Sequence, residues 1–526
     1  MSKYLSNAVA RMATPPQSEP LNERQIANNA GGYSFAVDDW ARFDRFLILG
    51  SEGGSYYASE RDLTKQNIEV VKRVVAADGL RAVARIVELS TDGRAPKNDP
   101  ALLALAYAAA KGDDKTRAAA LESLNDVARI GTHLFHFVDF VRKYRGWGRG
   151  LRRAIENWYT TKTADKMAEQ VVKYQQRDGW SHRDLMRLRH IHFSGAHQAV
   201  AKWVVKGESS RNLPAVVKGH IKLQAATDGK EAAALIREYG LVRESVPTEL
   251  LKESAVWEAL MEKMPLTSLI RNLGNLSKNG ILTPLSDAEK EISARLRDAV
   301  QLRKARIHPI QVLLASQVYA QGHGVLGHGE WKVAPRVIEA CREAFYLTFQ
   351  NIVPTGKNFY LGVDVSGSMS YGQIAGCPGV TPCVGSAAMA MVTARSEENY
   401  YVAGFSTQLV EIPVTKSDSL EDVVKKFSDR NFGGTDCAVA IKDATARNMK
   451  VDAFVIYTDG ETWAGDVHAA QALDRYRQKT GINSKLIVCG MVSNQMTVGD
   501  PADSGSLNVV GFDTATPQII AEFVKN

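Results

Sequence analysis

The sequence has 526 residues, of which 45% are hydrophobic and 23% charged, the composition of a soluble globular protein with room for more than one domain. No apolar run approaches the roughly 18–20 residues that span a bilayer, and the first residues lack the apolar stretch of a secretory signal, so we expect no membrane association. The net charge of +7 hides an asymmetry: residues 1–356 carry a formal charge of +12, which favours a polyanion as the partner of that part of the chain.

Residues from about 60 to 350 carry a helical pattern almost throughout. Val71 and Val74 recur at helical spacing, and Asp78-Gly79 ends their segment. Pro100 occupies a first-turn position and opens another helix. Further apolar positions continue the pattern along the chain, namely Val83, Ile86, Val87, Leu121, Leu124 and Val127.

The same region shows no strand alternation, and Ser181 and Asp184 have the spacing of a capping box ahead of one more helix. Helices of about 12–16 residues joined by short loops predict stacked helical pairs. Because no repeat is visible as sequence identity, we expect an irregular, HEAT-like array. A compact all-α domain is the alternative.

The pattern changes near Pro354, where short apolar strands begin to alternate with helices. We expect strands at Phe359–Val363, Tyr400–Phe405, Ala453–Tyr457 and Lys485–Cys489, and helices at Ala387–Ala394, Leu420–Phe427, Ala438–Arg447 and Val467–Arg477. This alternation predicts a doubly wound α/β sheet, whose ligands bind at the carboxyl ends of the strands. The expected organisation is therefore a helical-repeat domain at 1–356 and an α/β domain at 357–526.

Three polar motifs follow strands or loops of the α/β region. D-x-S-x-S directly follows its first strand, G-G-T-D lies on a later loop, and T-D-G ends the strand Ala453–Tyr457. In a parallel sheet all three meet at one edge. The candidate ligands are Asp364, Ser366, Ser368, Thr435 and Asp459.

Mg²⁺, or another hard divalent cation, suits this set because it prefers oxygen ligands and keeps some of its water. The hydroxyls are neutral, so the ion keeps a charge that favours an acidic group from a partner. The motifs resemble the metal-ion-dependent adhesion site of von Willebrand A domains. A serine-rich turn that caps a helix is the alternative. A phosphate-binding loop is not favoured, because no G-x-x-x-x-G-K-[ST] occurs.

The five cysteines are few, odd in number and widely spread, which is typical of a reducing cytoplasm and not of a disulfide framework. Cys377 and Cys383 are six positions apart, with no second pair at the spacing of zinc ligands. A zinc site is therefore not favoured.

Charge is unevenly divided between the two parts of the chain. Residues 357–526 hold 14 Lys and Arg against 19 Asp and Glu, a formal charge of −5, whereas 1–356 hold 51 against 39, or +12. The densest basic stretch, 142–190, has thirteen Lys and Arg, five acids and several interleaved aromatic residues. Guanidinium groups bind phosphate oxygens in pairs and aromatic faces stack on unpaired bases, so this stretch predicts a nucleic-acid interface.

Lys173 and Arg177 are four positions apart on one expected helix and would project from the same face. Against this interpretation, a basic helix face is more often plain solvated surface, and Trp158 and Trp180 fit a core better than a stacking platform. For His182 and His190 a hydrogen-bonding role is favoured over metal ligation. The candidate RNA-binding residues are Arg142, Lys143, Arg149, Arg152, Arg153, Lys173, Arg177, His182, Arg183, Arg187 and His190.

Several longer motifs resemble the Ro autoantigen family of TROVE-domain RNA-binding proteins, in its bacterial form, over nearly the whole chain. They are FLILGSEGGSYY at 46–57, GWSHRDLMRL at 179–188, MPLT at 264–267, RNLG at 271–274, KARIHP at 304–309, GGTDC at 433–437 and LIVCGM at 486–491. Ser366-Gly367-Ser368 departs from the S-A-S of many animal members but preserves the ligands. The loop-like insert Tyr371–Pro382 leaves the shape of the metal rim open.

The resemblance implies a closed ring of HEAT-like repeats whose ends are joined by the von Willebrand A domain. It implies that Y RNAs bind on the basic outer surface, where Lys173, Arg177 and His190 would lie. Misfolded RNAs would insert single-stranded 3′ ends into a central hole, and exoribonucleases would be partners in RNA decay and ribosomal RNA maturation. We expect a cytoplasmic, monomeric, non-catalytic protein.

Two other functions compete with RNA binding. The α/β domain could be a Mg²⁺-dependent adhesion module for an acidic protein, with the helices as a platform that lacks RNA specificity. A nuclease is not favoured, because no acidic cluster stands at two-metal spacing.

Overall fold

The computed structural model describes residues 15–52, 54–55, 57–189, 191, 193–323, 329–349, 353–374, 380–428 and 433–525. These residues fold into two compact units. The helical unit consists of residues 74–93 and 98–348. The sheet unit consists of residues up to 73, residues 94–97 and residues from 349 onward.

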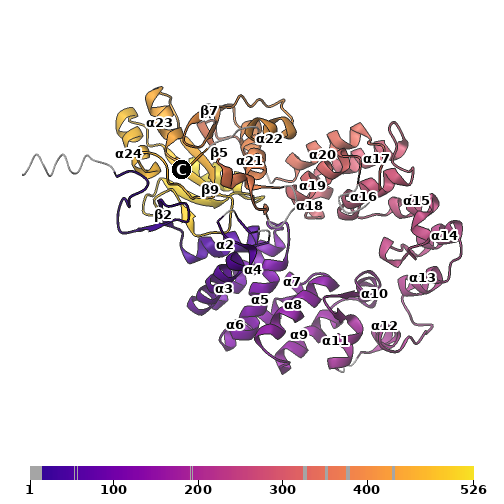
Figure 1. The fold of residues 1–526 in the computed structure, drawn as a ribbon. Coiled ribbons are helices and arrows are strands. Elements are labelled where there is room, and N and C mark those ends of the chain that lie inside the picture. Colours follow the sequence, from indigo (N-terminus) through magenta and orange to yellow (C-terminus); the bar gives the residue numbers. More distant parts are fainter. Residues whose placement is uncertain are drawn as a thin grey trace, which may run out of the picture. The chain divides into compact units, whose positions relative to one another are not determined.

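Helices make up almost all of the helical unit (Figure 1). The last residues of α3 (Glu60–Ala77) lead into it. They are followed by α4 (Gly79–Thr91), α5 (Asp99–Lys111), α6 (Asp114–Glu122), α7 (Leu124–Val127), α8 (Gly131–Tyr144), α9 (Arg149–Thr160), α10 (Ala164–Lys173), α11 (His182–Arg189), α12 (Gly195–Lys206), α13 (Ala215–Gln224), α14 (Gly229–Tyr239), the 3-10 turns η1 (Arg243–Ser245) and η2 (Leu250–Lys252), α15 (Ser254–Glu262), α16 (Leu266–Lys278), α17 (Asp287–Leu296), α18 (Ala299–Lys304), α19 (Pro309–Ala320) and α20 (Pro335–Leu347).

Short polar residues and glycines define where many of these helices begin and end. The side chain of Asp78 accepts from the backbone N–H of Arg81 at the start of α4, and Asp113 caps α6 in the same way. Gly207 and Gly240 end α12 and α14 in the left-handed conformation that favours glycine. Local sequence therefore fixes the helix boundaries.

Helices that follow one another pack together, as α4 with α5, α13 with α14, α14 with α15 and α19 with α20. Their apolar stripes form the core, where Leu105, Phe135 and Leu273 are almost fully buried. The expected series of packed helices is thereby confirmed.

Two details of the helical unit differ from the sequence expectation. Leu121 and Leu124 lie on separate helices, because the backbone of Ser123 is not helical and separates α6 from α7. A two-stranded hairpin, β3 (Gln176–Arg177) and β4 (Trp180–Ser181), occurs where no strand was expected. Asp178 and Gly179 form its turn, both with positive φ (51° and 77°), as a two-residue hairpin loop requires.

The sheet unit contains a six-stranded sheet in the order β11-β9-β8-β5-β6-β7. All neighbours are parallel except β6 and the edge strand β7. The strands are β5 (Asn358–Asp364), β6 (Asn399–Phe405), β7 (Leu409–Glu411), β8 (Ala453–Thr458), β9 (Lys485–Gly490) and β11 (Ser506–Val510). The helices are α21 (Pro382–Ser396), α22 (Leu420–Ser428), α23 (Val439–Ala446), α24 (Ala469–Thr480) and α25 (Thr516–Lys525), with the turn η3 (Gly367–Ser370) after β5.

Every strand and helix expected in this region is present, within a few residues at each end. The sequence did not indicate β7, β11 or α25. On one face of the sheet, Phe454, Ile456 and Val488 form a buried cluster with side chains of α23 and α24. The prediction of a doubly wound α/β domain is confirmed.

An N-terminal segment packs on this same unit. Strand β2 (Tyr33–Ala36) pairs with β1 (Gln25–Ala27) on one side and with β10 (Met496–Thr497) on the other, and Figure 1 shows β2 beside the yellow C-terminal strands. On α2 (Asp39–Leu49), Arg45 is buried and donates to the backbone oxygen of Met496 at 2.9 Å. Burial lowers the pKa of this guanidinium to about 10.

No helix within the described ranges is long and apolar enough to cross a membrane.

Candidate nucleic-acid interface and metal centre

The candidate metal centre lies where two central strands end. Asp364 is the last residue of β5, and Asp459 directly follows β8. The two strands are parallel neighbours, with Val363 opposite Tyr457, so both carboxylates stand at one edge of the sheet. This is the placement that the motifs predict.

Hydrogen bonds connect the first three candidate ligands. The backbone N–H of Ser366 donates to Asp364 Oδ1 at 2.9 Å, and the hydroxyl oxygens of Ser366 and Ser368 are 3.2 Å apart. Thr458 donates its hydroxyl to Asp364 Oδ2 at 2.7 Å. Ser368 in turn hydrogen-bonds to Asp459. Four of the five expected ligands therefore form one cluster.

The fifth candidate, Thr435, lies on a loop that is tied to the residues after β8. Its backbone oxygen accepts from the hydroxyl of Thr462 at 3.0 Å and from the N–H of Trp463 at 3.1 Å. A side chain at Gly434 would overlap the ring of Trp463, which explains the glycine. Thr435 is 1% exposed.

The electrostatics of the cluster suit a cation. Asp364 and Asp459 are both buried. Burial, and after it the negative charge of Asp459, raises the pKa of Asp364 to about 7, and burial also raises the pKa of Asp459. A divalent ion would offset this repulsion, and hydroxyls with few carboxylates form the kind of oxygen set that Mg²⁺ accepts. Among the described residues no group of three or more His, Cys, Asp and Glu side chains could hold a metal ion.

Residues from the N-terminal segment also reach this edge, and the motifs did not reveal them. Tyr57 hydrogen-bonds to Ser368, and burial together with the charges of Asp459 and Glu461 raises its pKa. Asn29 binds Glu461, whose pKa is raised to about 7, first by burial. The family stretch at 46–57 contained Tyr57, but no local pattern indicates a partner more than 300 positions away.

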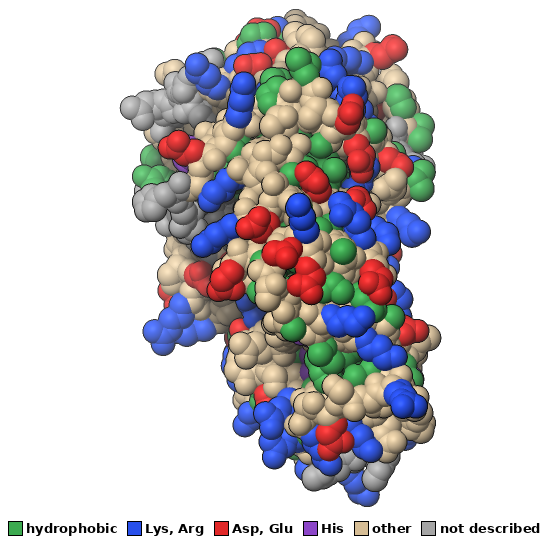
Figure 2. Space-filling model, turned by 90° about the vertical axis from the view of Figure 1, so that its right-hand side faces the viewer, with side chains coloured by type: hydrophobic (Ala, Val, Ile, Leu, Met, Phe, Trp, Pro, Cys, Tyr) green, Lys and Arg blue, Asp and Glu red, His purple; other side chains and the backbone are tan. Residues whose placement is uncertain are grey.

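The candidate interface begins with exposed cations in the helical unit. Eight candidates have exposed side chains: Arg142, Lys143, Arg149, Arg152, Arg153, Arg177, Arg183 and Arg187. Lys173 is half-buried. Within the described ranges only Lys143 and Arg177 form ion pairs, with Asp139 at 2.8 Å and Asp178 at 3.8 Å. On one face of the molecule, Figure 2 shows blue and red side chains mixed over the middle and mostly blue ones toward the lower end.

Lys173 and Arg177 do not share a helix, which corrects the sequence expectation. Helix α10 ends at Lys173, and Tyr174 caps it with a non-helical backbone. Arg177 lies instead on the hairpin strand β3, beside the Asp178-Gly179 turn. The preference of Asp178 and Gly179 for a tight turn ends the helix before Arg177, although the spacing of Lys173 and Arg177 fits one.

Aromatic side chains are held among these cations. The guanidinium of Arg142 lies 5.0 Å from the centre of the Trp180 ring, and the rings of Trp147 and Trp180 meet edge to face at 5.8 Å. Trp180 is only half-buried, whereas Trp158 is fully buried. The expected core role is therefore confirmed for Trp158 alone.

His182 is buried, at 2% exposure, so its assignment to the RNA-binding set is corrected. Its Nδ1 lies 2.8 Å from the hydroxyl oxygen of Tyr159, the hydrogen-bonding role favoured from the sequence. Burial lowers its pKa to about 3, which keeps the ring neutral. An imidazole in the core cannot reach a phosphate. His190 and Cys377 lie outside the described residues, as does 375–379 of the insert.

Comparisons with known proteins give a consistent result. The family model of the TROVE domain matches residues 26–233 and 235–326, and that of the Ro60 vWA domain matches 358–524. The chain is 43% identical to the RNA-binding protein RO60 of Deinococcus radiodurans, over 97% of both chains. It is 34% identical to the protein of that name from Caenorhabditis elegans, over 97% of this chain and 91% of the relative. The crystal structure of the Deinococcus radiodurans RO (RSR) protein matches with a TM-score of 0.72 and 42% identity, and the match covers 93% of this chain and 99% of the other.

Proposed function

The chain belongs to the Ro60 family of TROVE-domain proteins, and we propose that it binds RNA through the exposed Lys and Arg side chains of the segment from α8 to α11. The observation that carries this proposal is the set of six arginines there that form no ion pair with any described residue. Their guanidinium groups are open to phosphate oxygens, which they bind with charge-assisted hydrogen bonds.

The proposed ligands are structured RNAs that also carry unpaired nucleotides. Arginines at the exposed positions would contact the duplex backbone, while half-buried rings such as Trp180 offer apolar surface to unpaired bases. We extend the proposal to small non-coding Y RNAs, and to misfolded RNAs whose 3′ ends would enter the central hole that the family resemblance implies. The protein would present such RNAs to an exoribonuclease in the cytoplasm rather than cleave them itself.

The metal centre would hold Mg²⁺ through Ser366, Ser368 and Thr435, with Asp364 and Asp459 acting mainly through bound water. The raised pKa of Asp364 supports this role, because a bound cation would stabilise the ionised carboxylates. Such an ion supplies an open position for an acidic group of a partner protein. Adhesion through this site is the second candidate function, and it is compatible with RNA binding elsewhere on the chain.

The test of RNA binding is a pair of charge-removing variants in the full-length protein. Arg152→Ala with Arg153→Ala, two of these six arginines, should weaken binding to a structured RNA by about 1–3 kcal/mol at moderate salt, the loss of two charge-assisted contacts. The matched control, Lys230→Ala with Lys263→Ala, removes the same charge from exposed positions of the same unit. Fluorescence anisotropy measures both. Equal affinities for the two double variants would contradict the proposed interface.

A further inference from the structure

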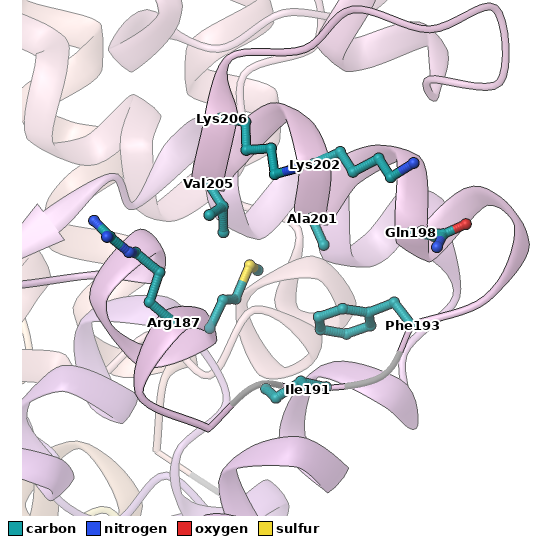
Figure 3. A pocket seen from close by; sticks show the side chains of 9 residues that line it. Arg187, Ile191, Phe193, Gln198, Ala201, Lys202, Val205 and Lys206 are labelled. Carbon is teal, nitrogen blue, oxygen red and sulfur yellow. The ribbon is translucent and has the colours of Figure 1, made fainter.

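A pocket of about 430 Å³ lies between α11 and α12, next to the cations of the proposed interface. Residues of both helices and of the segment that joins them line it (Figure 3). Its volume is in the range of sites that hold small molecules. None of its side chains belongs to the metal centre.

The inner wall of the pocket is apolar. Met186 and Ala201 are 4% and 9% exposed, and Ile191, Phe193 and Val205 are half-buried. In Figure 3 the side chains of Ala201 and Val205 project from α12 toward Phe193 and Ile191. A flat, hydrophobic group would fit against this wall, because the aromatic face of Phe193 and the polarizable thioether of Met186 both favour it.

The ring of Phe193 packs against a buried aromatic side chain. It meets the ring of Tyr159 edge to face, with the centroids 6.3 Å apart. Tyr159 is itself fully buried and fixed by its hydrogen bond to His182. The aromatic surface is therefore oriented before any ligand arrives, which reduces the entropy cost of binding.

The rim of the pocket is polar and basic. Gln198, Lys202 and Lys206 follow one another at intervals of four along α12, so they form a row on one face of the helix beside Ala201 and Val205. Arg187 stands on α11 on the other side (Figure 3). All four are exposed.

Little compensates the charge of this rim. Lys206 lies 3.5 Å from Glu208, but both side chains are more than half exposed and such pairs contribute little. Arg187 and Lys202 form no ion pair with any residue that the structure describes. None of the described residues that line the pocket is acidic. The rim is thus complementary to an anion on either side of an apolar body.

We propose that this pocket takes one unpaired nucleotide of a bound RNA, with the base against Phe193 and Met186 and the flanking phosphates at Arg187 and Lys202. The inference rests on the proposed RNA binding, and it specifies which part of the RNA enters the pocket. A duplex does not offer such a group, since its bases are stacked inside. A base at a bulge, loop or end can leave the stack, and the amide of Gln198 can hydrogen-bond to its edge.

The experiment compares two RNA hairpins that differ in one position. In the first, a 5-iodouridine forms a single-nucleotide bulge; in the second, the same nucleotide is paired. The full-length protein is bound to each, irradiated and digested, and the crosslinked residue is identified by mass spectrometry. The bulged RNA should crosslink to Phe193 or Met186, and the paired RNA should not.

Two variants of the pocket measure how much the bound nucleotide contributes to RNA affinity. Ala201→Trp fills the pocket, and Phe193→Leu keeps an apolar side chain but removes the stacking face. Each should weaken binding of the bulged RNA about tenfold, the loss of one stacked base, and leave the paired RNA unchanged. Ala196→Trp is the control, because it adds the same ring to an exposed position of the same helix that does not line the pocket.

The outcomes separate this inference from the proposed function. If the wild-type protein binds both hairpins with no crosslink in the pocket, and Phe193→Leu binds them as tightly as wild type, the pocket is not a nucleotide site while RNA binding stands. If the wild-type protein binds neither hairpin at low salt, both proposals fall.

Discussion

Asn29 and Glu461 are 432 positions apart, and Asn29 donates to both carboxylate oxygens of Glu461, from its backbone N–H and from its side-chain amide, at 2.7 Å each. Glu461 is 1% exposed, and its own N–H donates to Asp459 Oδ1 at 3.0 Å. The N-terminal segment therefore holds the loop that carries one of the candidate metal ligands.

Asn29→Ala should destabilise the protein by about 1–3 kcal/mol, because Glu461, which is 1% exposed, loses the hydrogen bond from the Asn29 amide. Urea unfolding followed by circular dichroism measures the change. Asn399→Ala, at an exposed position at the start of β6, is the control and should have little effect. An Asn29→Ala variant as stable as the control would show that the segment does not support the loop.

A buried ion pair ties a second segment to the sheet unit. Arg94 donates to Asp513 at 2.6 Å and 3.1 Å, and the two side chains are 10% and 1% exposed. Arg94→Met should cost about 3–5 kcal/mol, since it leaves a buried carboxylate without its cation. Adding Asp513→Leu should recover much of that loss in the same unfolding assay. A double variant as unstable as the sum of the two singles would mean that the pair is not coupled.

His136 joins α5 to the hairpin that carries Arg177. Its Nδ1 lies 2.5 Å from Asp99 and its Nε2 lies 3.0 Å from Asp178 in the hairpin turn. The hydrogen bond to Asp99, followed by the charges of both carboxylates, raises the pKa of His136, although burial and Arg177 oppose this. The stabilisation is therefore complete below the unfolded value of about 6.5 and is lost as pH rises through the higher folded pKa.

The measurement is the melting temperature of wild type and His136→Gln at pH 6 and at pH 8.5. When the pH is lowered from 8.5 to 6, the melting temperature of wild type should rise more than that of the variant, because only folded wild type binds the extra proton at position 136. His133 titrates with the opposite sign, since burial first, and the charge of His136 among the later causes, lowers its pKa to about 4. The effect of burial on His133 is present in both proteins and cancels in the comparison. If the melting temperatures of the two proteins depended on pH in the same way, protonated His136 would not stabilise the contact between α5 and the hairpin.

Removal of the metal centre should separate the two proposed sites. Asp364→Ala should abolish binding of Mn²⁺, measured by electron paramagnetic resonance as a substitute for Mg²⁺, and leave RNA affinity within about twofold of wild type. Asp474→Asn, an exposed acid on α24, should retain the metal. If Asp364→Ala lost RNA binding as well while staying folded, the metal centre would have to be part of the RNA site.

The sequence predicts the sheet well because apolar strands such as Ala453–Tyr457 and the motifs that follow them are local signals. Asp364, Ser366 and Ser368 come together through the same short turn that their spacing describes. Tyr57 contacts Ser368 and Asn29 contacts Glu461 only after the chain has folded back over hundreds of residues, and no local pattern predicts these contacts.

The errors in the helical unit have two causes. The spacing of Arg177 from Lys173 fits a helix, but the Asp178-Gly179 dipeptide beside it is a strong hairpin signal that the helical spacing alone does not take into account. The position of His182 in a basic stretch favours a contact with RNA, whereas its ring packs beside Phe135 and Trp158 in the core. Composition alone does not distinguish a polar residue that faces solvent from one that is satisfied inside.

The most direct test of the account is the affinity of the wild-type protein for a hairpin RNA with a single-stranded tail, measured from low to high KCl. If exposed arginines hold phosphates, the plot of log affinity against log salt should fall with a slope of about −3 or steeper, as expected for about four or more contacts. Affinity that does not change with salt, or no binding at low ionic strength, would contradict the claim that this basic surface binds RNA.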